Sequence, residues 1–318
     1  MSIKKPSELT FDNASYCVII QGVPGVGKTT LALSSERPLL IDFEDNQKGV
    51  QRLRAEDRRA TLVLENGWED LQNDLTAENL KDYKTIVIDP LGMAIDNYLF
   101  EYLKYDKSNF TKSGTKFSQS GWGEVKVQLK WLIQTCKRLK KNLIIVVHAI
   151  PEKDGEQTVY RPAIQGSLKN EIFNEVDLAC FMETVGDQRT ISFTPTDRYS
   201  AKGNHGVEGR YNVDDLTKVG KNVFLTKLLE IYHNNIMKEE EINTKYNAIM
   251  EKYTTLIENC ENADGINDLL VAIPNQEHYF SSKEELGARL NSKAKELGLV
   301  YNKATKKYES VKDNTDTN

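Results

Sequence analysis

The sequence predicts an α/β protein with a mainly parallel central sheet flanked by helices, an antiparallel hairpin at one edge of the sheet, and a helical C-terminal extension. Three observations predict this fold class. Apolar runs rich in β-branched residues alternate with segments of helical spacing, a glycine-rich loop joins the first run to a helical segment, and the composition changes to Lys, Glu and Asn from about residue 221. Near-continuous apolar strands separated by helices are typical of a parallel sheet covered on both faces.

The runs expected to form the sheet follow one another through the first half of the chain, each bounded by polar or turn-forming residues. They are CVII (17–20), PLLIDF (38–43), ATLVL (60–64), KTIVID (84–89) and NLIIVVH (142–148). Between them, apolar residues at helical spacing predict helices over 68–80, 91–104 and 122–140.

Two later runs predict the edge hairpin. VDLACFME (176–183) and RTISFTP (189–195) are separated only by the short polar segment TVGDQ, which favours antiparallel pairing. Heptad-like apolar spacing from residue 221 predicts one long helix or two in succession, and SSKEELGARLNSKAKELGL predicts another. We therefore expect an N-terminal arm (1–14), a core domain (15–215), a helical C-terminal extension (216–308) and a disordered tail (309–318).

Composition excludes several classes of protein. No run reaches the roughly 18 apolar residues of a membrane helix, and the N-terminus lacks the apolar core of a signal peptide, so we expect a cytoplasmic protein without a membrane partner. The four cysteines, Cys17, Cys136, Cys180 and Cys260, are scattered and form no CxxC pair, which predicts free thiols. Because the formal net charge is -5, any nucleic-acid contact must come from local clusters of basic residues.

The segment GVPGVGKT (22–29) matches the phosphate-binding pattern G-x-x-x-x-G-K-[ST] in full. A predicted strand precedes it and a predicted helix follows it, as this loop requires. Its glycines let backbone N–H groups turn toward phosphates, and the helix N-terminus adds partial positive charge. We expect Lys28 to reach the β- and γ-phosphates and Thr29 to hold Mg²⁺. The residues expected to bind ATP are Gly22, Val23, Pro24, Gly25, Val26, Gly27, Lys28, Thr29 and Thr30.

Polar residues that end three of the predicted strands are candidates for the chemistry at the phosphates. Asp89 ends KTIVID and fits a Mg²⁺ ligand that acts through water, with capping of the next helix as the alternative. If 38–44 lies next to the strand before the glycine-rich loop, Glu44 can orient the attacking water. Asp42 and Asp45 are alternatives to Glu44. His148 ends NLIIVV and is expected to sense the γ-phosphate, or else to pack at a strand end.

These motifs, in their order and spacing, resemble the RecA-like recombinase core, and most closely the small phage-encoded RecA-like ATP-binding proteins that act as single-strand annealing proteins. The resemblance covers about residues 12–212 and implies a RecA-like ATPase core. It implies a catalytic role for Glu44 and γ-phosphate sensing by His148. The segment TDRYSAKGN is similar to a basic motif of that family and matches Lys202, whereas Asn204 stands where a further Arg is often found. Arg198 and Arg210 are therefore substitutes for a cation that acts in trans.

RecA-like cores contact DNA through two loops that follow the third and fourth strands, and the resemblance places these loops at 105–123 and 151–170. The first mixes lysines with aromatic residues, which suits attraction to a backbone and stacking on bases. A surface loop or a subunit contact is the alternative for both. The candidates for DNA contact are Lys107, Phe110, Lys112, Lys116, Phe117, Trp122, Arg161 and Lys169.

The resemblance implies an ATP-dependent recombination protein that binds single-stranded DNA and promotes annealing or strand exchange, with ATP and Mg²⁺ as cofactors and ATP at the interface of a homo-oligomer. A single-strand DNA-binding protein is a further expected partner. Three alternatives stay open: a RecA-like helicase or loader motor, a partner-binding protein switched by ATP, and a small-molecule kinase. A kinase lid needs several arginines, and the segment after 148 offers only Arg161.

Overall fold

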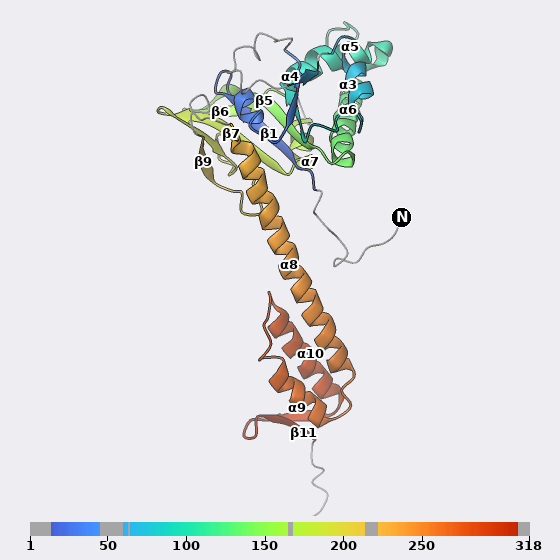
Figure 1. Cartoon of the computed structure of the whole chain (residues 1–318), viewed down its shortest axis with the longest axis vertical. Helices are drawn as coiled ribbons and strands as arrows, with labels where there is room; N and C mark the ends of the chain where they lie inside the picture. The colour runs from blue at the N-terminus through green and yellow to red at the C-terminus, as the bar shows by residue number, and fades with distance from the viewer. Residues whose placement is uncertain (1–13, 45–59, 63, 165–167, 214–221, 311–318) are drawn as a thin grey trace, which may run out of the picture. The chain divides into compact units, whose positions relative to one another are not determined.

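The computed structural model of the chain describes residues 14–44, 60–62, 64–164, 168–213 and 222–310. The chain divides into two compact units, one within Asp12–Asn235 and the other within Ile236–Asn318. The long helix α8 (Phe224–Glu258) contributes to both units (Figure 1). None of the described helices is long and apolar enough to cross a membrane.

The larger unit is built on one mixed sheet, to which nine strands of the described residues contribute (Figure 1). Six strands run parallel, and β8 and β9 continue the sheet in antiparallel fashion beyond β7. The order is β3 (Thr61–Leu62), β2 (Pro38–Asp42), β4 (Thr85–Asp89), β5 (Asn142–Asp154), β1 (Cys17–Gly22), β7 (Leu178–Val185), β8 (Gln188–Ser192) and β9 (Arg210–Val213). The predicted fold class, including the antiparallel edge hairpin, is confirmed.

The condition set for the role of Glu44, that 38–44 lies next to the strand before the glycine-rich loop, is not met. β4 and β5 separate β2 from β1, and the neighbours of β1 are β5 and β7. The apolar half of β5 is buried over Asn142–Val147 and fills the position beside β1. The carboxyl ends of these strands still meet at one edge, because the register pairs Asp42 with Asp89 and His148 with Gly22.

The second half of β5 corrects the expectation of a loop over 151–170. β5 continues to Asp154 and pairs with β6 (Gln157–Pro162) in an antiparallel ribbon that turns at Gly155. Helix α7 (Leu168–Glu175) follows. The residues of the ribbon beyond Ile150 are mostly exposed, so the segment lacks the apolar run by which the inner strands were recognised.

Helices cover the buried face of the sheet that contains Ile19, Ile41, Ile88 and Ile145. The main ones are α3 (Trp68–Asp74), α6 (Gln119–Arg138) and α7. The segment 91–105 is a succession of short turns rather than one α-helix: α4 (Leu91–Met93), the π-helix η3 (Ala94–Leu99), α5 (Phe100–Tyr102) and the 3₁₀ turn η4 (Leu103–Tyr105), after which a second 3₁₀ turn, η5 (Lys107–Asn109), follows.

The helix after the glycine-rich loop, α1 (Lys28–Ala32), is joined to the beginning of α8. Ser34 accepts hydrogen bonds from the backbone N–H of Leu225 at its Oγ and from that of Thr226 at its carbonyl oxygen. Asn222 donates its side-chain amide to the Thr30 carbonyl at 2.9 Å. The first turns of α8 are thus part of the unit that carries the sheet.

The smaller unit combines the end of α8 with α9 (Ala263–Ala272), α10 (Ser282–Glu296) and a hairpin of β10 (Leu299–Asn302) and β11 (Lys307–Ser310). The hairpin corrects the expectation that 216–308 is wholly helical and that a disordered tail begins at 309. Tyr308 is buried, and Asn267 of α9 bonds to both its backbone N–H and its carbonyl. Residues 311–318, and 1–13 of the expected arm, lie outside the described part of the chain.

Candidate active site

The glycine-rich loop lies between β1 and α1. Gly25 and Gly27 have φ angles of 79° and 106°, in the left-handed region that residues with a Cβ rarely adopt. Gly22 is required for a different reason, because a Cβ at this position would lie 2.4 Å from the Met182 carbonyl oxygen of β7. The sequence therefore forms the loop from local backbone freedom at two glycines and from close strand packing at the third.

Lys28 begins α1 and points into the site rather than toward solvent. Only 4% of it is exposed, and its Nζ donates to the Val23 carbonyl at 2.9 Å across the loop. Burial lowers the pKa of Lys28, while the nearby carboxylates Asp89 and Glu44 act in the opposite direction. An ammonium group held in this way inside the loop is placed to meet an anion.

Thr29 and Asp89, the two residues predicted to hold Mg²⁺, are in direct contact. The Thr29 hydroxyl donates to Asp89 Oδ2 at 2.5 Å, although the two residues are far apart in the sequence. Burial raises the pKa of Asp89 to about 6, the Thr29 hydrogen bond acts against that increase, and Glu44 adds to it. A buried carboxylate of this kind is stabilised when a cation is bound beside it.

Glu44 and His148 form the second half of the site. His148 Nε2 lies 3.3 Å from Glu44 Oε1, and Glu44 donates its backbone N–H to Asp42 Oδ1 at 3.0 Å. Both side chains remain partly exposed. His148 Nδ1 is buried and has no hydrogen-bond partner among the described residues. The structure thus brings Glu44 and His148 together even though β2 is not adjacent to β1, whereas Asp45 lies outside the described residues.

The residues present fit a nucleotide with Mg²⁺. The loop has the backbone conformation that phosphate binding requires, Lys28 supplies a cation, and Thr29 with Asp89 supplies a hydroxyl and a carboxylate. The part of the chain that the structure describes contains no group of three or more His, Cys, Asp or Glu side chains that could hold a metal without other ligands. Oxygen ligands from phosphates and water complete such a site in nucleotide-binding proteins.

Arg189, on β8, is a residue at this site that sequence reasoning missed. Its Nε donates to the Val26 carbonyl of the glycine-rich loop at 3.1 Å. The contact joins residues separated by most of the core domain, and no motif surrounds Arg189 in the sequence. The predicted hairpin of 176–195 was the only available signal, and it did not reveal that the hairpin lies against the loop.

The three candidates for a cation acting in trans are all engaged within their own chain. Lys202 Nζ donates to the carbonyls of Phe173, Asn174 and Val176 at the end of α7. Arg198 lies over the Tyr160 ring, and Arg210 pairs with Glu183 at 2.9 Å. A trans role for any of them stays a prediction that requires these contacts to be exchanged.

In the segment 105–123 the lysines lie on the surface, whereas the candidate aromatic side chains pack against one another. Lys107, Lys112 and Lys116 are exposed, but Phe110 and Phe117 stack on each other with ring centroids 5.4 Å apart, and Phe117 is only 8% exposed. Trp122 packs edge-on against Phe117. The expected stacking of Phe117 on bases is therefore not available in this arrangement, because its ring belongs to the core.

Arg161 and Lys169, the candidates in 151–170, lie close together. Arg161 is exposed on β6 with its Nε 3.8 Å from Glu152 Oε2. The pKa of Lys169 is lowered, mainly by burial and also by the charge of Arg161, and the Glu152 carboxylate only partly opposes this shift. The two cations therefore share one surface region, in which one carboxylate offsets part of their charge.

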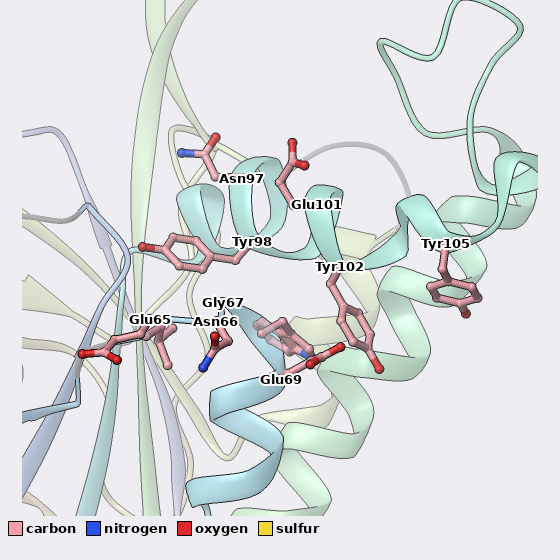
Figure 2. Close-up of a pocket in the computed structure, with 11 residues that line it drawn as sticks. Glu65, Asn66, Gly67, Glu69, Asn97, Tyr98, Glu101, Tyr102 and Tyr105 are labelled. Carbon is pink, nitrogen blue, oxygen red and sulfur yellow. The ribbon is translucent and has the colours of Figure 1, made fainter.

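A cavity of about 670 Å³ lies away from the glycine-rich loop, between the beginning of α3 and the segment 91–105 (Figure 2). Figure 2 shows Tyr98, Tyr102 and Tyr105 on one side and the loop of Glu65 and Asn66 on the other. Glu65, Glu69 and Glu101 contribute carboxylates, and its lining contains no Lys or Arg. Lys104 pairs with Glu101 beside the lining, but Glu65 and Glu69 still give the cavity an excess of negative charge, and no residue of the glycine-rich loop lines it, so this cavity is not the nucleotide site.

A protein family described as AAA domain matches residues 14–205, which is more than half of the chain. No curated protein matches the chain. Among solved structures, the flagellar accessory protein FlaH from Methanocaldococcus jannaschii is similar, with 11% identity, 55% of this chain and 75% of FlaH covered, and a TM-score of 0.32.

Proposed function

The chain belongs to the AAA domain family and has a RecA-like P-loop fold, and on this basis we propose that it is an ATPase that binds single-stranded DNA and promotes annealing or strand exchange. The more general statement within this proposal, that the chain is a P-loop ATPase of RecA-like type, rests on the family and the fold. The coupling of hydrolysis to DNA, the assembly of subunits around ATP and the recombination role go beyond them.

The observation that carries the ATPase proposal is the Thr29–Asp89 contact beside the buried ammonium of Lys28. In the proposal, backbone N–H groups of the glycine-rich loop and Lys28 bind the phosphates, and Thr29 with Asp89 holds Mg²⁺. Bound Mg²⁺ neutralises charge on the phosphates. Asp89 is already buried, so the protein has made the main desolvation step before the cation binds.

Glu44 is the residue proposed to orient the attacking water. Its Oε1 lies 3.3 Å from His148 Nε2, and its charge raises the pKa of both Lys28 and Asp89. His148 lies beside Gly22 in the register of β5 with β1. A water between Glu44 and the γ-phosphate would therefore be held by a carboxylate whose orientation the imidazole controls.

The DNA part of the proposal is supported by the exposed lysines Lys107, Lys112 and Lys116, which lie between the segment 91–105 and α6. Cations that neutralise phosphates give an affinity that falls with salt. Because Phe110 and Phe117 stack on one another, the proposal gives this surface contacts to the phosphate backbone rather than base stacking. Binding of this kind is independent of base sequence.

The test is steady-state ATP hydrolysis with and without single-stranded DNA, at low and higher salt, for the wild-type protein and for Lys28→Ala and Glu44→Gln. We expect DNA to stimulate turnover at low salt, the stimulation to weaken at higher salt, and both variants to lose it. Glu44→Gln should still bind a non-hydrolysable ATP analogue, whereas Lys28→Ala should not.

A matched control is the triple variant Lys107→Gln, Lys112→Gln and Lys116→Gln, which lies outside the nucleotide site. We expect it to keep DNA-independent hydrolysis and to lose stimulation. Hydrolysis that ignores DNA, together with no DNA binding in the presence of the ATP analogue, would overturn the recombination proposal and favour an ATP-switched partner-binding protein. A gel-based annealing assay with complementary strands then separates annealing from translocation on a duplex.

A further inference from the structure

We infer that Arg189 is a positioning residue of the nucleotide site, which holds the peptide between Val26 and Gly27 so that the Gly27 N–H faces the bound phosphates. This inference rests on the proposed ATPase function, since it concerns the same loop. Arg189 acts within its own chain, so the inference does not depend on whether Lys202, Arg198 or Arg210 acts in trans.

The contact that carries the inference is a hydrogen bond from Arg189 Nε to the Val26 carbonyl at 3.1 Å. In a trans peptide, the carbonyl of one residue and the N–H of the next point in opposite directions. Asp89–Pro90 is the only cis peptide of the described residues, so the Val26–Gly27 peptide is trans. An arginine that holds the Val26 carbonyl outward therefore directs the Gly27 N–H toward the interior of the loop.

The β7–β8 hairpin gives Arg189 a rigid base for this contact. Its backbone pairs with Thr184 on β7 and with Val213 on β9, so it lies on a strand with neighbours on both sides. The same hairpin also lies against the loop at other points. A Cβ on Gly22 would collide with the Met182 carbonyl oxygen. A Cβ on Gly27 would lie 3.5 Å from the side chains of both Met182 and Arg189. The hairpin thus supports the loop at both of its ends.

Arginine suits this position better than other residues. The guanidinium stays charged at all relevant pH values and carries five N–H donors. Nε is used on Val26, and the described residues offer no hydrogen-bond partner to the two Nη groups. Arg189 is partly buried, where a positive charge is screened less than at the surface. The residue therefore acts on phosphates in two ways, by orienting a donor and by placing a positive charge behind the loop.

The test measures the affinity of ADP with Mg²⁺ and of inorganic pyrophosphate by calorimetry for the wild-type protein, Arg189→Met, Arg189→Gln and Arg189→Lys. Gln keeps a neutral donor and Lys keeps the charge, so both should rescue part of the loss. We expect Arg189→Met to weaken both ligands by about 10- to 100-fold, the range for loss of a charged hydrogen bond. The loss should be the same for the two ligands, because the effect acts through phosphates.

Three outcomes would overturn the inference. They are an unchanged ADP affinity in Arg189→Met, a loss for ADP without a loss for pyrophosphate, and a loss explained by unfolding, seen as a large fall in the melting temperature of the nucleotide-free protein. Arg138→Met, at an exposed arginine that ends α6 and so precedes β5, is the control and should match the wild-type protein. If Lys28→Ala binds ADP as tightly as the wild-type protein does, the proposed ATPase site itself fails, whatever Arg189 does.

Discussion

At the scale of residues, the candidate site depends on polar groups that few water molecules can reach. Lys28 and Asp89 are buried, and each pKa is shifted by burial in the direction that disfavours its charge. Their mutual attraction and the Thr29 hydrogen bond offset part of that cost. Such groups gain more from a phosphate and a divalent cation than exposed groups would, because water screens them less.

His148 and Glu44 should behave as one unit. We expect His148→Ala to lower kcat by about 10- to 100-fold, less than the roughly 100- to 10,000-fold of a full general acid–base contribution, because the imidazole orients Glu44 rather than transferring the proton itself. ADP affinity should stay within about twofold, because the His148 side chain contacts Glu44 and its pairing with Gly22 is made by the backbone, which alanine keeps. Stopped-flow hydrolysis and ADP titration measure the two quantities.

The double variant His148→Ala with Glu44→Gln shows whether His148 acts through Glu44 or independently of it. If the imidazole acts only by orienting Glu44, His148→Ala should cost almost nothing further once Glu44 is replaced. Multiplicative losses in the double variant would show that His148 acts separately from Glu44.

The cysteines should differ sharply in reactivity, because the thiolate is the reactive form. Burial raises the pKa of Cys136 and Cys180 to about 12 and that of Cys17 well above its usual value. Burial also raises the pKa of Cys260, but this thiol is only half-buried and so remains accessible to a reagent. A thiol-specific dye should therefore label one cysteine in the native protein and four after denaturation, as counted by mass spectrometry. Native labelling of Cys17 or Cys180 would contradict the packing of the sheet.

At the scale of elements, the beginning of α6 depends on a close backbone contact. A Cβ on Gly121 would lie 1.9 Å from the Asn109 carbonyl oxygen, whereas a Cβ on Gly123, two residues further along the same helix, would meet nothing within 4 Å. The Ser118 side chain caps this helix by accepting from the Gly121 N–H. The connection after η5 is thus held against α6 by a contact that only glycine allows.

This pair gives a matched prediction. Gly121→Ala should lower the free energy of unfolding by about 1–3 kcal/mol through overpacking. Gly123→Ala should raise it by up to about 1 kcal/mol, since alanine favours a helix over glycine. Chemical denaturation of both variants measures the difference. Equal effects of the two substitutions would mean that Asn109 can move away without cost.

The sequence predicted the strands whose residues are buried on both faces of the sheet, and it missed strands that are partly or mostly exposed. The runs at 17–20, 84–89 and 142–147 lie in strands because the residues of these strands are buried and mostly apolar. β6 and β9 have mixed burial, and β10 and β11 are mostly exposed. Such strands form through pairing with neighbours that are not evident from their own composition.

At the scale of the whole molecule, α8 contributes to both compact units. Its first turns bury Leu225, Leu228, Leu229 and Tyr232 and bond to Ser34 just after α1. The smaller unit has its own core of α8, α9, α10 and hairpin residues, including Ile257, Ile266, Leu290 and Tyr308. Each unit therefore has apolar packing of its own.

Two truncations test this division. A chain that ends after Asn235 keeps the first turns of α8 and should retain wild-type ADP affinity and a cooperative melting transition. A chain that ends after Val223 loses four buried side chains, each contributing about 1.5–3 kcal/mol, and should fail to melt cooperatively. Loss of ADP binding in the longer chain would show that the larger unit needs residues beyond Asn235.

The sequence by itself determined the features that depend on neighbouring residues: the glycine-rich loop, whose φ angles only glycine tolerates readily, the continuous apolar strands, and the acids and histidine that end them. Tertiary structure decided what depends on residues far apart in the chain. It placed β4 and β5 between β2 and β1, buried Phe117 beneath exposed lysines, joined Glu44 to His148, and brought Arg189 to the loop. The physical reason is that local patterns set backbone conformation and hydrophobic faces, whereas the order of strands in a sheet follows from how all of these faces pack together.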